Sequence, residues 1–454
     1  MSASADSDTI AAIATAPGRG GVAVLRLSGP SATELAATVA GSLPPARQAA
    51  LRVLRDADGE IIDRALLLTF PGPHSFTGED VIEFQLHGSP VIAAMLLQRL
   101  VSLGAREAGP GEFTRRAFMN GRLDLAQAEA VADLVASAST AAARAALRSL
   151  EGEFSVAVHA LVEALTLLRV RLEAGLDFPE EGVDAFTDPA LAGELQDLLG
   201  RLATLRAAAE RGRVLRDGLT LVIAGAPNAG KSSLLNRLAG YEAAIVTELP
   251  GTTRDLVRED ILIDGMPVRV VDTAGLRDAA DRVEAEGIRR AHDAMHRADL
   301  VLLVQDCSAA AAPGTAPASA PALPADVPVL RAWNKIDLAG LPPGQGRDAD
   351  GNEVLRLSAL TGAGIELLRA RLKAFAGYGD GVEGSFAARR RHLDALDRAR
   401  ARLRQAGALL AGGQAVELAA EELRLAQAAL GEITGEFTTE DLLGRIFSEF
   451  CIGK

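Results

Sequence analysis

A glycine-rich segment in the middle of the chain restricts its fold more than any other feature. Residues 225–232 read GAPNAGKS, follow the apolar run LTLVIAG and precede a helical pattern that begins at Lys231. A segment of the form G-x-x-x-x-G-K-[ST] wraps its backbone N–H groups around phosphates at the start of a helix, so it needs a strand before it and a helix after it. The sequence therefore predicts an α/β domain with a phosphate-binding loop.

This predicted α/β domain lies between two stretches of helical sequence. Residues 218–377 alternate between strand and helix patterns, which is typical of an open parallel sheet with helices on both faces. Residues 121–217 and 378–454 have apolar residues at helical spacing, and residues 1–120 read as a mixed α/β domain. The predicted fold class is α/β plus all-α, with the α/β domain inserted into one helical domain that both flanks form.

The composition excludes several classes of protein. The 454-residue chain is 48% hydrophobic and 24% charged, as globular proteins are, and no stretch approaches the roughly 20 apolar residues of a membrane span. The acidic, polar start MSASADSDTI does not have the form of a secretory signal. The only two cysteines, Cys307 and Cys451, exclude a disulfide framework and a cysteine-rich metal site. We therefore expect a cytoplasmic protein that has no membrane partner.

The net charge of −13 bears on the partners that the chain can bind. Phosphate binding over a large surface needs a basic protein that releases counterions, so this chain does not have nucleic-acid wrapping as its main task. A nucleic-acid substrate would be bound largely by a more basic partner.

The phosphate loop and two later motifs predict a Mg²⁺-nucleotide site. Lys231 should reach the β- and γ-phosphates, where a compact ammonium fits better than the fork of an arginine, and Ser232 should ligate Mg²⁺. In the DTAG motif that ends an apolar strand, Asp272 can hold Mg²⁺ through water and the Gly275 N–H can meet a γ-phosphate. Thr253, in the GTTRD segment between them, is our candidate for the threonine that closes on Mg²⁺ when the γ-phosphate is present.

The NKID motif predicts that the base is guanine. Its last residue, Asp337, offers two acceptor oxygens to the N1–H and the exocyclic amine of guanine, donors that adenine lacks. Ser358 and Ala359 fit the loop whose backbone contacts the guanine oxygen. The motifs together predict a protein that binds and hydrolyses GTP.

The residue after Gly275 bears on the hydrolytic mechanism. Ras-like enzymes use a glutamine there to orient water, whereas this chain has Leu276, which cannot do so. Another group must take that role. On spacing alone the candidates in the following segment are Asp278, Asp281, Glu284 and Glu286.

Across nearly its whole length the sequence resembles the MnmE (TrmE) family of tRNA-modification GTPases. The motifs that carry the resemblance are APGRGGVAVLRLSG, HSFTGEDVIEFQLHG, PGEFTRRAFMNGRLDLAQAEAV, GAPNAGKSSLLN, GTTRD, DTAGLRDAADRVEAEGI, NKID and the terminal FSEFCIGK. The order of the predicted domains agrees with that of the family.

The resemblance implies a GTPase that uses K⁺ in place of an arginine finger. By the match, the side-chain oxygen of Asn228 and a loop with oxygens from Thr247, Leu249 and Thr252 would hold K⁺ beside the phosphates. A cation there would supply positive charge to the transition state. The water-orienting glutamate of the family matches Glu284, which would act through a second water and would be catalytic together with Lys231.

The resemblance further implies an N-terminal domain that dimerises and binds a tetrahydrofolate one-carbon donor, in the 5,10-methylene or 5-formyl form. The matching residues are Arg26, Glu83, Arg122 and Lys454, of which Arg122 departs from the lysine common in the family. Cys451 lies beside the terminal lysine, and we consider two interpretations of it. It packs with an amphipathic helix, or it takes part in the modification at the folate site.

The residues expected to bind GTP belong to the phosphate loop, the two threonine-containing segments and the base motifs. They are Asn228, Ala229, Gly230, Lys231, Ser232, Ser233, Thr247, Thr252, Thr253, Asp272, Thr273, Ala274, Gly275, Asn334, Lys335, Asp337, Ser358 and Ala359.

Two functions are consistent with these motifs. By the resemblance, a homodimer would act with a flavin-containing partner of the MnmG kind to add a (carboxymethyl)aminomethyl group to C5 of the wobble uridine of certain tRNAs. The alternative is a regulatory GTPase switch of the ribosome-assembly type, without modification chemistry. The terminal CIGK and the glycine-rich N-terminal domain distinguish them, because a switch needs neither.

Overall fold

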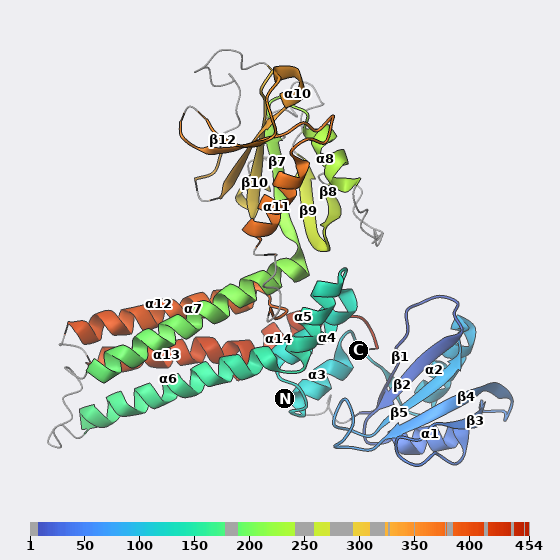
Figure 1. Ribbon diagram of the computed structural model, residues 1–454. Coiled ribbons are helices and arrows are strands. Elements are labelled where there is room, and N and C mark those ends of the chain that lie inside the picture. The colour runs from blue at the N-terminus through green and yellow to red at the C-terminus, as the bar shows by residue number, and fades with distance from the viewer. Residues whose placement is uncertain are drawn as a thin grey trace, which may run out of the picture. The chain divides into compact units, whose positions relative to one another are not determined.

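The computed structural model describes residues 8–177, 189–240, 258–272, 294–308, 323–325, 327–348, 350–376, 378, 385–412, 416–436, 440–448 and 450–453. The chain forms two compact units (Figure 1). The first comprises residues 1–135, 148–202 and 394–454, and the second comprises residues 136–147 and 203–393.

The first unit contains a sheet domain, a helical bundle and the C-terminal segment. Its elements are β1 (Ile10–Ile13), β2 (Val22–Ser28), α1 (Ala32–Ala40), β3 (Ala50–Arg55), β4 (Ile61–Phe70), β5 (Val81–His87), α2 (Pro90–Ser102), β6 (Arg106–Glu107), α3 (Glu112–Met119), α4 (Leu125–Ala136), α6 (Glu153–Asp177), α13 (Val416–Thr434) and α14 (Glu440–Ser448). Like α4, which ends one residue beyond the first unit, three further helices contain residues of both units: α5 (Thr140–Leu150), α7 (Pro189–Asp217) and α12 (Arg390–Ala411).

The six strands of the N-terminal sheet run in the order β3-β4-β5-β2-β1-β6 and are antiparallel, except that β1 and β6 are parallel. Alternation along β2 turns Leu25 and Leu27 into the core beneath α1 and α2, and turns Arg26 to the opposite face. These strands and the helices α1 and α2 form the mixed α/β domain expected for residues 1–120.

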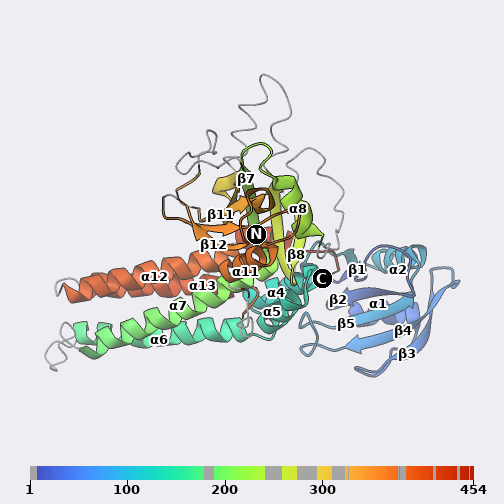
Figure 2. The same ribbon diagram turned by 45° about the horizontal axis from the view of Figure 1, so that its top comes forward.

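Helices from both flanks of the α/β domain pack together, as the predicted fold class requires. Figures 1 and 2 show α6, α7, α12 and α13 side by side. Arg169 of α6 donates to the Gln427 side chain of α13 at 2.7 Å, and Arg398 of α12 makes two bonds of 2.9 and 2.6 Å to Glu432 of α13. These contacts join residues 258 and 34 positions apart in the chain. The boundaries at residues 120, 217 and 377 stay a prediction.

The second unit is built on a seven-stranded sheet of order β12-β13-β11-β10-β7-β9-β8. Its elements are β7 (Leu219–Gly225), α8 (Lys231–Ala239), β8 (Arg258–Ile263), β9 (Met266–Asp272), β10 (Leu300–Asp306), β11 (Val329–Asn334), α10 (Ile336–Ala339), β12 (Gly344–Arg347), β13 (Glu353–Arg356) and α11 (Ile365–Phe375). The five central strands are parallel, and β8 and β12 are antiparallel edge strands. The predicted parallel sheet is confirmed, and the two antiparallel edge strands extend it beyond the prediction.

Burial on both faces explains why β7 reads as a continuous apolar run. Leu221 and Ile223 belong to the core that α8 and α11 cover, whereas Val222 and Ala224 belong to the core on the other face. A strand that is buried on both sides has no polar face, so the sequence shows no alternation there.

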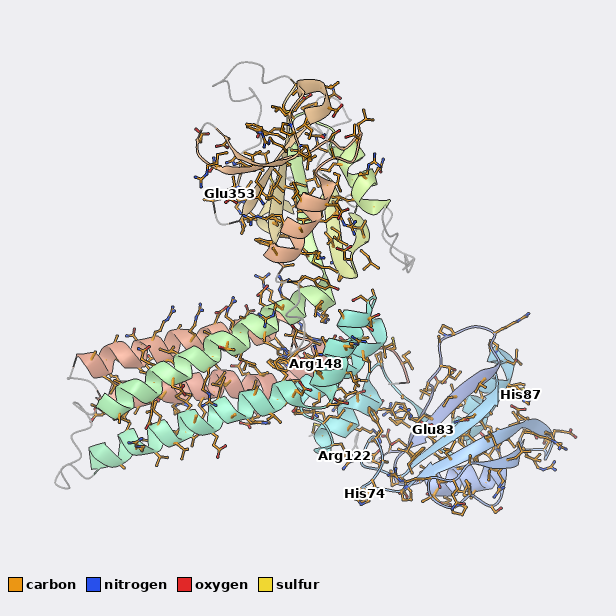
Figure 3. All side chains as sticks on the ribbon, in the orientation of Figure 1. His74, Glu83, His87, Arg122, Arg148 and Glu353 are labelled. Carbon is orange, nitrogen blue, oxygen red and sulfur yellow. The ribbon has the colours of Figure 1, made fainter. Side chains whose placement is uncertain are left out.

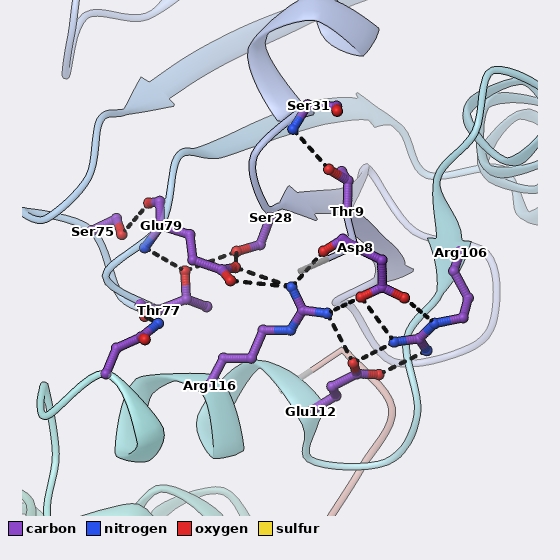
Figure 4. Close-up of polar contacts among 11 residues, drawn as sticks. Asp8, Thr9, Ser28, Ser31, Ser75, Thr77, Glu79, Arg106, Glu112 and Arg116 are labelled. Carbon is purple, nitrogen blue, oxygen red and sulfur yellow. Dashed lines mark hydrogen bonds and ion pairs between the residues drawn. The ribbon is translucent and has the colours of Figure 1, made fainter. Parts of the chain in front are cut away.

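A buried acid–arginine network holds α3 against the N-terminal sheet (Figure 4). The Arg116 side chain is 4% exposed and pairs with Asp8 at 2.6 Å, with Glu112 at 3.1 Å and with Glu79 at 3.2 Å. Arg106 also pairs with Asp8 and Glu112. Burial alone would raise the pKa values of Asp8 and Glu112. Hydrogen bonds from Arg106 and Arg116, and for Glu112 also from a backbone N–H, outweigh this effect. The pKa of Asp8 therefore lies below its ordinary value of 3.8, and that of Glu112 below 4.5.

Among the residues that the structure describes, no helix is both long enough and apolar enough to cross a membrane.

We expect Arg116→Met to destabilise the protein by about 1–3 kcal/mol, because it removes the charge-assisted hydrogen bonds of the buried cation, while Arg106 still pairs with Asp8 and Glu112. Asp8 and Glu112 have lower pKa values in the folded protein than in the unfolded chain. Their charged forms therefore stabilise the fold at a pH above the unfolded-state pKa values, and this stabilisation is lost as the pH falls through the folded-state pKa values. Denaturant unfolding between pH 7 and pH 3 measures both effects, and the variant should lose less stability on acidification than the parent. The exposed pair Glu421–Arg424 gives a control, since Arg424→Met should change neither quantity. Equal stability of Arg116→Met and the parent at pH 7 would contradict this account of the network.

Candidate functional site

The phosphate loop (residues 225–232) lies at the point where the strand order of the second unit's sheet reverses. It follows the carboxyl end of β7, whose two neighbours are β9 on one side and β10 on the other. In open α/β sheets, ligands bind outside the carboxyl ends of the strands at such a switch point. The ends of β7, β10 and β11 are joined in register, with Val304 opposite Gly225 and Asp306 opposite Asn334.

The backbone of the phosphate loop requires glycine at its last position before α8. Gly230 has φ +91°, and a Cβ there would lie 2.2 Å from the Asn334 side-chain nitrogen. Asn228, which is exposed, also has a positive φ of 62°. Left-handed residues at these two positions turn the loop sharply before the helix begins, which is the geometry of an anion-binding concavity.

Lys231 begins α8 and its side chain lies across the loop. Its Nζ donates to the carbonyl oxygens of Gly225 at 3.1 Å and Ala226 at 2.9 Å, and the residue is 7% exposed. Ser232 is exposed in the first turn of α8, as is Ser233.

Asn334 joins the phosphate loop to the loop after β13. It is 2% exposed, its Nδ2 donates to the Ala229 carbonyl at 2.8 Å, and its Oδ1 accepts from the Ala359 N–H at 2.9 Å. The Ala359 N–H expected to meet the guanine oxygen is thus bonded to Asn334, so a base would have to share it. Ser358 is fully buried, and its hydroxyl accepts from the Thr361 N–H at 3.1 Å.

The next residues of the NKID motif point in different directions. Lys335 has φ +66°, a left-handed conformation that is uncommon for a residue with a side chain, and its Nζ lies 2.5 Å from Asp306 Oδ2. Asp337 is exposed on α10. Burial would raise the pKa of Asp306, but the bonds from Lys335 and Ser308 outweigh it and lower the pKa. Asp306 was not among the predicted site residues.

Cys307, next to Asp306, is buried, and its thiol donates to the Asn334 carbonyl at 2.9 Å. Burial and the nearby Asp306 raise the pKa of this thiol, so it stays protonated.

Several predicted site residues lie outside the described residues. They are Thr247, Leu249, Thr252, Thr253, Thr273, Ala274, Gly275, Glu284 and Lys454. Asp272 is described only as the last residue of β9, opposite Ile223 of β7. Within the described part of the chain, no three His, Cys, Asp or Glu side chains gather as a metal site would require.

Two of the predicted folate residues form a cross-strand pair on the N-terminal sheet. Arg26 of β2 is opposite Glu83 of β5, and the guanidinium makes bonds of 3.0 and 2.8 Å to one carboxylate oxygen. The guanidinium carbon lies 5.6 Å from the ring centres of both Phe76 and Phe113. This cation between two aromatic rings, paired with a carboxylate, is a half-buried polar centre on the sheet face that α1 and α2 leave uncovered.

Arg122 lies beyond the end of α3, and Glu83 lies on the sheet (Figure 3). Arg122 is exposed, and its Cγ would lie 3.3 Å from a Cβ on Gly78. Gly78 belongs to the same loop as Phe76, so Arg122 and Arg26 border one loop between β4 and β5.

The C-terminal tail (residues 450–453) docks on the N-terminal domain within the first unit. Ile452 pairs with Pro110, the Cys451 carbonyl accepts from the Gly111 N–H at 3.3 Å, and a Cβ on Gly453 would lie 2.5 Å from the Ile13 carbonyl.

The helix before the tail is anchored separately from Cys451. Ile446, Phe447 and Phe450 pack in one core with Leu125 of α4. Cys451 itself is exposed, which speaks against the packing interpretation of this residue.

Comparisons with known proteins agree with this arrangement. A family model of the MnmE helical domain matches residues 125–451, and a model of the GTP-binding protein TrmE N-terminus matches residues 9–122. The tRNA modification GTPase MnmE of Alkalilimnicola ehrlichii is 57% identical over 446 residues, which cover 98% of this chain and 99% of that protein.

The chain belongs to the MnmE family of tRNA modification GTPases. As a member of the MnmE family it is a GTP hydrolase.

Solved structures similar to this MnmE-family chain include two GTP-binding proteins. The G domain of the FeoB iron transporter of T. maritima is 25% identical, with 35% of this chain and 98% of that chain covered and a TM-score of 0.25. A variant of Aquifex aeolicus Era bound to GDP and AlF₄⁻ is 22% identical, with 40% of this chain and 66% of that chain covered and a TM-score of 0.25.

Proposed function

We propose that this protein is a K⁺-dependent GTP hydrolase that acts with a flavin-containing partner to add a (carboxymethyl)aminomethyl group to C5 of the wobble uridine of certain tRNAs. The observation that carries the proposal is the 57% identity to a tRNA modification GTPase over 98% of the chain. Its action in the cytoplasm and its homodimer, formed through the N-terminal domain, belong to the same proposal.

The phosphate half of the site supports binding of Mg²⁺-GTP. Phosphate oxygens would take the place of the Gly225 and Ala226 carbonyls at the Lys231 ammonium, and the exposed Ser232 hydroxyl fits a Mg²⁺ ligand. Thr253 would complete the Mg²⁺ ligands, and Asp272 would act through water. Bound Mg²⁺ would neutralise charge on the β- and γ-phosphates.

The base half of the site supports guanine. The exposed Asp337 carboxylate makes no hydrogen bond or ion pair with the other described residues. It lies three residues after Asn334, whose side chain bonds to the phosphate loop and to the loop after β13. A carboxylate there accepts from two donors of guanine and rejects adenine, which lacks them.

Two groups would replace the arginine finger and the water-orienting glutamine of Ras-like systems. Asn228 projects from an exposed, left-handed position of the phosphate loop, where its side-chain oxygen can hold K⁺ together with Thr247, Leu249 and Thr252. When bound, K⁺ would supply positive charge to the transition state. Glu284 would orient the attacking water through a second water, because Leu276 cannot.

The N-terminal domain supports the folate part of the proposal. The half-buried Arg26–Glu83 pair offers a donor and an acceptor between aromatic rings, and the docked tail carries the exposed Cys451 and then Lys454. Arg122 would contribute a second cation. A regulatory switch has no use for a terminal tail that pairs with this domain, so the tail favours modification over the alternative function.

We expect GTP hydrolysis to be at least about tenfold faster in K⁺ than in Na⁺ of equal ionic strength, because the larger ion fits the oxygen cage beside Asn228. Steady-state phosphate release measures this. Asn228→Ala should remove the difference while GTP still binds, and equal parent rates in the two salts would refute the cation assignment.

We expect Glu284→Ala to abolish turnover while GTP still binds, since the residue orients water and does not hold the nucleotide. Single-turnover hydrolysis and equilibrium binding of a GTP analogue measure the two parts. Glu286→Ala, two residues away, is the matched control and should retain turnover. Hydrolysis retained by Glu284→Ala would remove the residue from the role.

Nucleoside analysis of tRNA tests the proposed function as a whole. Cells that lack this chain should lose the (carboxymethyl)aminomethyl group from wobble uridines, and the parent gene should restore it. The Cys451→Ser gene should fail to restore it if the thiol takes part. Unchanged wobble uridines in the deletion strain would eliminate modification and leave the regulatory switch.

A further inference from the structure

Asp306 is a charged residue at the nucleotide end of the sheet that no motif includes. It is the last residue of β10 and lies opposite Asn334 of β11 in the parallel register. Its Oδ1 accepts from the Ser308 N–H at 2.9 Å and from the Ser308 hydroxyl at 2.6 Å. These two bonds fix the carboxylate, and its Oδ2 faces the Lys335 ammonium at 2.5 Å.

The lysine that Asp306 holds has an unfavourable backbone conformation. A non-glycine residue in the left-handed region costs of order 1 kcal/mol or more, and it persists only where surrounding contacts determine it. Here the ion pair fixes the side chain, and the Lys335 carbonyl accepts from the Leu338 N–H at 3.0 Å. The Asp306 side chain is 24% exposed and the Lys335 side chain is 30% exposed, so water screens the ion pair only in part.

The conformation of Lys335 decides where its neighbours point. Because the chain turns through a left-handed residue, the side chain before it (Asn334) enters the core, whereas Asp337 emerges on the surface of α10. The left-handed residue thus lies between the buried Asn334, which bonds to Ala229 and Ala359, and the exposed Asp337. The Asp306–Lys335 ion pair therefore lies next to Asp337, the residue proposed to recognise the base.

We propose that Asp306 is a positioning residue for guanine: through Lys335 it holds the left-handed turn that presents Asp337 to the base. The proposal rests on the proposed base site at Asp337 and adds a specificity-determining residue to it.

Asp306→Asn tests the proposal in the full-length protein. We expect the Kd values for GDP and for a non-hydrolysable GTP analogue to rise by about tenfold, the size expected for loss of one charge-assisted hydrogen bond. GDP release should be faster, and kcat at saturating GTP should be unchanged. The preference for GTP over ITP should shrink, since ITP lacks the exocyclic amine that Asp337 reads.

Asp299→Asn is the matched control at the other end of β10. Asp299 pairs with Arg213 at 2.8 Å and accepts from the Thr220 N–H at 2.9 Å, so its loss should lower thermal stability without changing the nucleotide Kd. A lower Tm in Asp306→Asn with a parental Kd and a parental GTP-to-ITP ratio would overturn the proposal. Loss of affinity in Asp299→Asn equal to that in Asp306→Asn would also overturn it, because the effect would then follow stability alone.

A double-mutant cycle with Lys335→Met separates Asp306 from the base site itself. If Asp306 acts through Lys335, Asp306→Asn should add little to the effect of Lys335→Met. Additive effects would overturn the positioning role. Asp337→Ala should weaken GTP binding in every case; if it does not, the base-site assignment fails, whereas failure of Asp306→Asn alone overturns only the inference.

Discussion

The two hydrogen bonds of the buried Asn334 amide hold the nucleotide site together. Its nitrogen bonds to the phosphate loop and its oxygen bonds to the loop after β13, so one side chain fixes segments 105 and 25 residues away in the chain. Gly230 must lack a side chain to allow this approach. The phosphate and base halves of the site therefore share one buried, hydrogen-bonded side chain.

In the first unit the ion pairs of Arg116 join separate segments, as the Asn334 amide does in the second unit. Arg116 gathers carboxylates from the N-terminal segment, the β4–β5 loop and α3 itself, and these three segments frame the sheet face that carries Arg26 and Glu83. Arg116 is the buried member of this network, and Arg106 also pairs with two of its carboxylates, Asp8 and Glu112. The same region receives the C-terminal tail, so the polar centre, the network and the tail form one assembly.

Much of the fold was predictable because its signals are local. The phosphate-loop motif, the apolar strands and the helical flanks each depend on residues close together in the sequence. The β8–β9 hairpin also has a local signal: Asp264 and Gly265, both with positive φ, form the Asp-Gly turn typical of two-residue hairpins. Strand β12, GQGR, has no apolar pattern and forms only by pairing with β13. Asp306 could not be recognised either, because a lone acidic residue after a strand acquires a role only when the sheet brings Lys335 beside it.

The docking of the tail has a consequence for the order in which the protein can be built. The second unit is complete once residue 393 has been synthesised, and it contains its own core on both faces of the sheet. In the first unit Gly453 lies beside Ile13 of β1, although 439 residues lie between them in the chain. The core of the N-terminal sheet contains no tail residue, so the sheet can form early, but its contacts with the tail can form only after the nucleotide-binding unit has been synthesised.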